Sequence, residues 1–278
     1  MRRILIAAVA VAVAPAALAQ LKGDGIIEPG EDEMAELARA VQNPVANLIS
    51  LPFQNNTTFE FGPQEDPQNV LNIQPVWPFE LNEDWNLITR TIFPIISQPE
   101  LFPGQGRETG LGDISFSAFA SPAKPDKMLW GKVLWGLGPA VLMPTATDDR
   151  LGTDKWSLGP SLVLLGMPGN WVIGGLMNNV WSVGGSGDQN VNFFFSQWFA
   201  NYNLEDGWYL VSAPIITANW EASSDSQWTV PVGGGVGKIF MIGKQPVNVN
   251  LQAYYNVEKP DFVGDWGGRI QLQFMFPK

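Results

Sequence analysis

Val247 to Val257 (VNVNLQAYYNV) decides the fold class, because apolar and polar residues alternate along its whole length. Successive side chains of a strand point to opposite faces, so the alternation predicts a β-strand with one apolar and one polar face. Arg269 to Phe276 (RIQLQFMF) repeats the pattern, and Val70 to Phe79 does the same. The polar faces carry Asn and Gln with almost no charge, which favours the lumen of a membrane barrel over the open surface of a soluble sandwich.

The connections between the expected strands alternate in character along the chain. The short ones are residues 81–84, 168–170, 204–207 and 243–246, with 121–127 somewhat longer. The other set, which is often longer and polar, comprises residues 62–68, 97–110, 145–155, 184–190, 221–227 and 258–265. Membrane barrels have short periplasmic turns and longer outer loops. The sequence therefore predicts an all-β, up-and-down antiparallel transmembrane barrel of about twelve strands, an even number as in other bacterial single-chain barrels.

Tryptophan marks the ends of the expected strands. Ten indoles open or close a strand beside a turn or loop: Trp77, Trp85, Trp130, Trp156, Trp171, Trp181, Trp208, Trp220, Trp228 and Trp266. Only Trp135 and Trp198 fall mid-strand, where a soluble core would bury its large aromatics. Indole rings prefer the headgroup layer, so two belts at the strand ends indicate a membrane barrel. The alternative is a secreted lectin-like or jelly-roll protein with surface tryptophans.

The phase of the strands gives the candidate lining of the lumen. Its members are Asn72, Gln74, Arg90, Asn248, Asn250, Gln252, Tyr254, Arg269, Gln271 and Gln273. Amides with a couple of arginines would make a polar passage that weakly repels cations. The alternative is that these side chains hydrogen-bond one another and fill a small barrel, because barrels of about eight strands pack shut and those of about 16 to 18 leave a channel. Phenylalanines within residues 191–202 would add an apolar surface that suits an aromatic solute.

Residues 1–19 read as a signal peptide. Arg2 and Arg3 precede a short apolar stretch, and an A-x-A site ending at Ala19 would release a chain that begins at Gln20. No later stretch approaches the roughly 20 continuous apolar residues that a spanning helix needs. Together these features predict export to the outer membrane of a Gram-negative bacterium.

Residues 20–53 form an N-terminal segment that differs in texture from the barrel at 54–278. Its acidic start and the helical spacing of Met34, Leu37, Ala38 and Val41 predict a short amphipathic helix. This helix would sit in the lumen as a plug or cap the periplasmic side. We hypothesise that its acidic residues pair with Arg90 or Arg269.

The composition excludes several classes of function. The chain has no His, the commonest general base and a frequent zinc ligand, and no Cys. A formal net charge of −11 argues against nucleic-acid binding, which needs clustered Lys and Arg. We therefore expect no enzyme activity and no cofactor. Asp148, Asp149 and Asp154 are a weak candidate for a divalent-metal site, because their spacing matches no known calcium loop.

Several runs resemble a family of bacterial outer-membrane barrels. They are QNPVANLISLPFQ (42–54), LNIQP (71–75), LNEDWNLITRT (81–91), GLGDI (110–114), GPAVLMPTATD (138–148), KWSLGP (155–160), DGWYLVSAPIITANW (206–220) and PVGGGVGK (231–238). The family is grouped with the "MetA pathway of phenol degradation" proteins, some of them labelled neuromedin U. The resemblance implies a transporter-like barrel for aromatic or hydrophobic compounds, and it carries no catalytic or substrate motif.

Two hypotheses about function follow. The first is a passive channel for small, aromatic or hydrophobic molecules. The second is a closed structural or adhesive barrel, whose expected loops of about 4 to 14 residues would be short for that task. In both, the expected partners are outer-membrane lipid, lipopolysaccharide and the barrel assembly machinery, with a small-molecule solute in the first. The sequence leaves the oligomeric state open.

Overall fold

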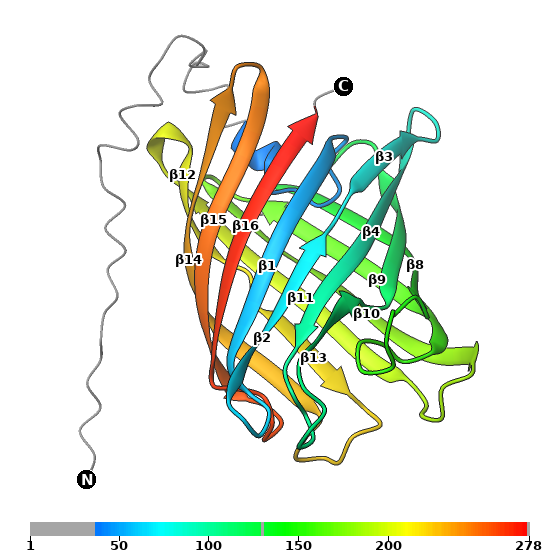
Figure 1. The fold of residues 1–278 in the computed structure, drawn as a ribbon. Helices are drawn as coiled ribbons and strands as arrows, with labels where there is room; N and C mark the ends of the chain where they lie inside the picture. Colours follow the sequence, from blue (N-terminus) through cyan, green and yellow to red (C-terminus); the bar gives the residue numbers. More distant parts are fainter. Residues whose placement is uncertain (1–36, 129–130, 277–278) are drawn as a thin grey trace.

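Twelve antiparallel passages of the chain close into one barrel (Figure 1). The computed structural model describes residues 37–128 and 131–276. Most passages are single strands: β1 (Ile49–Phe61), β4 (Trp85–Gln98), β8 (Gly131–Met143), β9 (Lys155–Met167), β10 (Trp171–Gly185), β11 (Asn192–Asn203), β14 (Trp228–Ile242), β15 (Gln245–Glu258) and β16 (Trp266–Phe276). Three are interrupted: β2 (Asp66–Ile73) with β3 (Val76–Glu80), β5 (Glu108–Leu111) with β6 (Ile114–Pro122) and β7 (Asp126–Met128), and β12 (Trp208–Ser212) with β13 (Ile215–Asn219).

Each passage pairs with its neighbours in the sequence, so the topology is up-and-down. The first and last strands, β1 and β16, pair from Ile49 with Phe276 to Thr58 with Gly267 and close the sheet on itself. Closure gives the outer strands a partner, which removes the unpaired backbone edge that lipid cannot satisfy. The predicted fold class and strand number are confirmed.

Two of the interruptions fall at prolines, at Gln74–Pro75 and at Ala213–Pro214. Proline has no backbone N–H to donate to a ladder, so a strand breaks there most easily. Around the first break the backbone still finds partners: the Gln74 N–H donates to the Pro52 carbonyl at 2.9 Å. The single strand expected from Val70 to Phe79 is therefore two segments.

Two expected boundaries differ in the structure. Strand β7 pairs with β8, Asp126 opposite Val133, so part of the turn expected at 121–127 is strand. The barrel begins at Ile49 and not at residue 54, because the pairing of β1 with β16 starts there. Pro52 hides this start in the sequence, since proline is rare within strands.

Strand β15 shows how the barrel uses alternation. Asn248 and Gln252 are buried inside it, 3% and 4% exposed, whereas Leu251 between them is 49% exposed on the outside. Large apolar side chains are exposed in the same way around the barrel. A continuous apolar outer surface of this kind marks contact with lipid.

Helical structure in the described residues is limited to a turn at residues 37–41 and the 3₁₀ turn η1 (Glu205–Gly207). None of the helices that the structure describes is long and apolar enough to cross a membrane.

Candidate functional site

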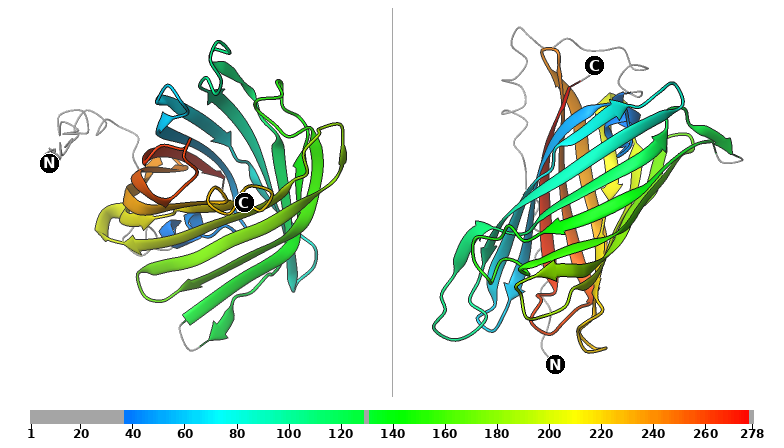
Figure 2. Two further views of the ribbon diagram at one scale, coloured as in Figure 1. Left: turned by 90° about the horizontal axis from the view of Figure 1, so that it is seen from below. Right: turned by 90° about the vertical axis from the view of Figure 1, so that its right-hand side faces the viewer.

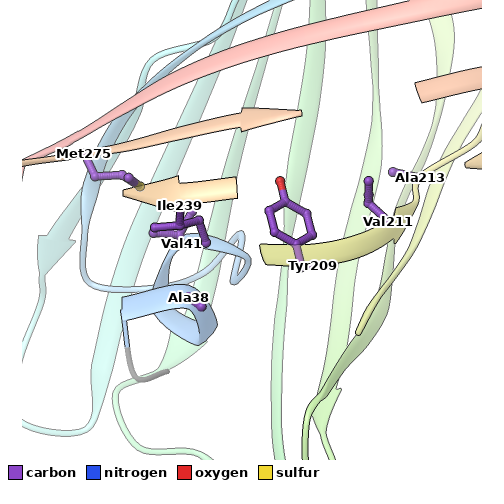
Figure 3. Close-up of a cluster of buried hydrophobic side chains, with 7 residues drawn as sticks. All are labelled: Ala38, Val41, Tyr209, Val211, Ala213, Ile239 and Met275. Atoms are coloured by element: carbon purple, nitrogen blue, oxygen red, sulfur yellow. The ribbon is translucent and has the colours of Figure 1, made fainter. Parts of the chain in front are cut away.

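The described chain begins with a helical turn at the end of the barrel that carries the short turns (Figure 2). Ala38 and Val41, on one face of this turn, pack against the inner wall (Figure 3). Their neighbours there include Tyr209, Ile239 and Met275, from β12, β14 and β16. The helical face expected from the spacing of Ala38 and Val41 is therefore used to fill the lumen. The acidic residues of the expected helix lie outside the described residues.

After the helical turn, the chain reaches the opposite inner wall. Val45 is 4% exposed and belongs to a second buried cluster, with side chains from β4, β6, β9 and β10. Ile88, Phe119 and Val172 are among its members. One stretch of chain thus touches both sides of the barrel, and we call residues 37–48 the lumen segment.

Hydrogen bonds hold the lumen segment to the short-turn end. Arg39 Nη2 donates to the Gly169 carbonyl at 3.1 Å. The side-chain amides of Gln42 and Asn203 bond each other in both directions, at 2.8 and 3.2 Å. Asn47 adds a bond to Glu80 at 2.9 Å. These contacts join the segment to Glu80 and to the neighbouring residues Gly169 and Asn203 on the rim.

A cavity of about 170 Å³ remains between the lumen segment and the walls. Its lining contains most of the predicted residues: Gln74, Arg90, Asn248, Asn250, Gln252, Arg269, Gln271 and Gln273. Asn72 and Tyr254 are not among the lining residues. Asn72 pairs with Gln54 across the sheet, and Tyr254 is 6% exposed. The predicted polar face therefore borders this cavity.

Hydrogen bonds connect the amides of the wall into a network centred on Tyr209. The Tyr209 hydroxyl donates to Asn248 Oδ1 at 2.7 Å and accepts from Asn250 Nδ2 at 3.2 Å. Asn248 in turn donates to Gln273 Oε1 at 3.1 Å. All four side chains are at most 7% exposed. Buried amides need such partners, so the network explains how a polar wall is tolerated inside the barrel.

The same network continues to the break between β12 and β13. Gln252 donates to Asn250 at 2.7 Å and accepts from the Tyr254 hydroxyl. That hydroxyl accepts from the Ala213 N–H at 2.9 Å. The Ala213 carbonyl accepts from Arg269 Nη1 at 2.6 Å. Inner-wall side chains thus satisfy the backbone groups of Ala213, the residue before Pro214.

Arg269 lies deep in the wall, 5% exposed. Besides Ala213, its guanidinium donates from Nε to Asn56 Oδ1 at 2.8 Å and lies 5.1 Å from the centre of the Tyr254 ring. The other predicted cation, Arg90, donates from Nη2 to Gln74 Oε1 at 2.5 Å. Both cations therefore have neutral partners within the described residues.

Some lining residues were not predicted, chiefly Tyr209, Gln54, Gln197 and Asn201. Gln54 belongs to the run QNNTT, where both faces of the strand are polar and alternation gives no phase. Tyr209 lies in a strand of only five residues, too short for a clear period, although its exposed neighbours Trp208 and Leu210 fit the outward phase.

No protein-family model and no curated protein matches the chain. Among solved structures, the COG4313 outer membrane channel from Pseudomonas putida F1 gives a TM-score of 0.61 at 16% identity, covering 91% of this chain and 97% of that chain. The chain has an outer-membrane β-barrel fold. Outer membrane phospholipase A from Escherichia coli gives a TM-score of 0.42 at 14% identity, covering 83% and 96%. OmpF from Salmonella typhi, solved with daunomycin, gives 0.36 at 8% identity, covering 82% and 96%.

Most of the described tryptophans lie near the ends of strands, where the strands meet the turns and loops. Five of the candidates are the first residues of their strands, and Trp156 is the second residue of β9; the five are Trp85, Trp171, Trp208, Trp228 and Trp266. Trp77 lies in β3, and Trp220 directly follows β13. Trp181 differs from expectation, because β10 continues past it to Gly185. Trp130 lies outside the described residues.

The remaining tryptophans extend this picture. Trp135, expected mid-strand, lies against Trp85 at 5.8 Å between ring centres and donates to Asp126 at 3.2 Å. Trp198 is 49% exposed on the outer surface. At the other end of the barrel, Trp220 and Trp228 pack edge to face at 5.2 Å. Clusters of this kind suit the interface, where one ring edge meets water.

The acidic loop residues are engaged with other groups. Asp148 accepts from Arg150 Nε at 2.8 Å, and Arg150 also donates to Glu108. The hydrogen bond from Arg150 lowers the pKa of the Asp148 carboxyl from its ordinary value of 3.8. Within residues 37–128 and 131–276, no three acidic side chains are placed to hold a metal ion. The geometry thus gives the candidate site at Asp148, Asp149 and Asp154 no support.

Proposed function

We propose that the protein is an outer-membrane channel for the passive passage of small molecules. The observation that carries the proposal is the lumen cavity, lined by amides and two arginines and enclosed by a barrel with an apolar outer face. Interior positions of a barrel that serves only as a scaffold are usually filled by side chains. Here the wall is polar, and part of the lumen is not filled by side chains.

We propose that the solutes are small and include molecules with an apolar or aromatic body. Three apolar side chains line the cavity together with the amides: Leu176, Phe199 and Val211. Aromatic and aliphatic side chains are the usual lining of small-molecule sites, with a few polar groups that fix orientation. The resemblance to the phenol-degradation barrels agrees with such solutes, and we propose membership of that group.

We also propose that residues 1–19 are removed on export and that the lumen segment, residues 37–48, acts as a plug. The partners would be outer-membrane lipid, lipopolysaccharide and the barrel assembly machinery. We propose no catalytic activity, because the chain has no His to activate a nucleophile. Mass spectrometry of peptides from the protein purified from outer membranes should give an N-terminal peptide that starts at Gln20.

A closed structural barrel is the second candidate, and one observation favours it. The wall amides already bond one another around Tyr209, and Val41 and Val45 pack tightly on two inner walls. When the polar groups of the lumen already bond one another, fewer of them are available to bind a solute. The two candidates differ in whether anything crosses the barrel.

Liposome swelling with solutes of graded size separates the two. The full-length protein is reconstituted, and neutral sugars and small polar aromatics are added outside. A channel gives swelling rates above those of protein-free liposomes, falling as solute size increases. Swelling no faster than in protein-free liposomes for every solute would remove the channel and leave the closed barrel.

A further inference from the structure

We propose that the lumen cavity binds a small organic anion with an apolar body, with its carboxylate on Arg269 and with Arg90 adding positive charge in the same cavity. The site is the lumen cavity, so the inference rests on the proposed channel function and names the class of solute. Both arginines line that cavity, one from β16 and one from β4.

Arg269 has unused capacity to bind an anion. It is 5% exposed, and its described contacts are Asn56 Oδ1, the Ala213 carbonyl and the Tyr254 ring. These contacts engage Nε and Nη1, and Nη2 has no hydrogen-bond partner among the described residues. An arginine offers five N–H donors, so a free edge remains for a further acceptor.

Arg90 is in the same situation. Only its Nη2 is engaged, by Gln74, and neither Nε nor Nη1 has a partner within the described part of the chain. No acidic side chain is among the described residues that line the cavity. The described part of the chain contains four ion pairs, and none of them involves Arg90 or Arg269. Two cations therefore line one cavity, and no countercharge for either lies among the described residues.

Physical chemistry favours an anion in this space. A buried charge is costly unless it is paired, and a guanidinium matches a carboxylate with two parallel hydrogen bonds. A carboxylate is therefore the ligand group that would lower the free energy of both side chains. A neutral solute would leave the charges as they are.

The remaining lining defines the body of the ligand. Leu176, Phe199 and Val211 supply apolar surface in the same cavity. Its volume of about 170 Å³ is close to the roughly 150 Å³ of an apolar protein cavity that accommodates benzene. A carboxylate with a single ring therefore fits both the charge and the space.

The acidic N-terminal residues of this chain are a competing source of carboxylate. They lie within residues 20–36, which precede the lumen segment in sequence. We commit to a solute, because the cavity adds apolar surface that an acidic peptide does not need. The experiment includes a variant without residues 20–36 to separate the two sources.

Equilibrium dialysis of benzoate tests the site directly on the full-length protein in detergent. Benzamide, which has the same shape and no charge, is the matched ligand. We expect saturable benzoate binding at least about tenfold tighter than benzamide binding, the scale of a hydrogen-bonded charge. R90Q and R269Q should each weaken benzoate binding about tenfold and leave benzamide unchanged, whereas R269K should retain most of it.

The control variant is R107Q, which removes an exposed loop arginine paired with Asp66. It should bind benzoate like the wild type. The shift in gel mobility on heating, which folded membrane barrels give, checks that each variant is folded. If R269Q fails this check, R90Q and R269K still decide the outcome. R90Q keeps Arg269, and R269K keeps a cationic donor for the Ala213 carbonyl.

Three results would overturn the proposal. They are equal affinity for benzoate and benzamide, wild-type benzoate binding in folded R90Q, and benzoate binding that appears only after residues 20–36 are deleted. The last result would assign the arginines to the N-terminal acids. Failure of the channel itself is seen separately, as benzoate binding without solute flux in liposomes.

Discussion

At the scale of single residues, Gly237 shows how a small residue on the inner wall makes room for the amide network. Gly237 pairs with Tyr209 across β14 and β12. A Cβ at this position would lie 2.1 Å from Tyr209 Cζ. The ring is held by Asn248 and Asn250 through its hydroxyl, so it has little freedom to move away.

Substitution of Gly237 by Ala should therefore destabilise the barrel by about 1–3 kcal/mol, the usual cost of forcing an extra methyl into a packed interior. The measurement is urea-induced unfolding in lipid vesicles. Gly166→Ala in β9 is the matched control, because a Cβ there meets nothing within 4 Å, and we expect a change of at most about 0.5 kcal/mol. Equal stability of the two variants would show that Tyr209 is not held in place.

The same scale shows what could be read from residues alone. The inner positions of β15 and β16 were predicted because eleven residues of β15 and eight of β16 alternate between apolar and polar with few exceptions. Gln54 and Tyr209 were not, since one lies in a polar run and the other in a short strand. Which amides bond which was not predictable either, because the partners come from different strands.

At the scale of elements, a network of hydrogen bonds shapes the outer loop at residues 144–154. Asp113, between β5 and β6, accepts from the backbone N–H groups of Thr145 and Thr153 at 3.2 and 2.7 Å. Arg150 joins the loop to Glu108 and Asp148. Asp113 therefore holds this loop against the end of the barrel wall.

The loop should loosen at acid pH. The bond from Arg150 lowers the pKa of Asp148 in the folded state, so the stabilisation that this bond gives the loop is fully present above the ordinary pKa of 3.8. The stabilisation is lost as the pH falls through the lower pKa of the folded state. The mobility of a nitroxide label at D149C, in a chain that has no native Cys, should therefore rise below a pH of about 4.

The control for that experiment is the same label with Asp148→Asn. This variant should show higher mobility at neutral pH and a smaller change on acidification. A label whose mobility follows the same curve in both proteins would mean that Asp148 does not hold the loop.

The strand breaks also belong to this scale. Pro75 and Pro214 are visible in the sequence, and proline is a known interruption of a ladder. The sequence does not say whether a strand ends or resumes after the proline. That depends on partners such as Pro52 and Tyr254, which lie on other strands.

At the scale of the whole molecule, closure and strand number followed from patterns that repeat along the chain. Alternating connection lengths and tryptophans at strand ends are local signals, so they were readable without contacts. The position of the lumen segment was not, because it depends on residues far apart in sequence. Arg39 and Gly169 are 130 positions apart, and Gln42 and Asn203 are 161 apart.

Single-channel conductance in planar bilayers tests most directly the claim that residues 37–48 occupy the lumen of a channel. The full-length protein is compared with a deletion of residues 20–42, which removes Ala38, Val41 and Gln42. A deletion of residues 20–36 is the control, because it leaves every described contact in place. We predict a conductance several-fold higher for the longer deletion than for the control. Equal conductance in all three proteins would contradict the account.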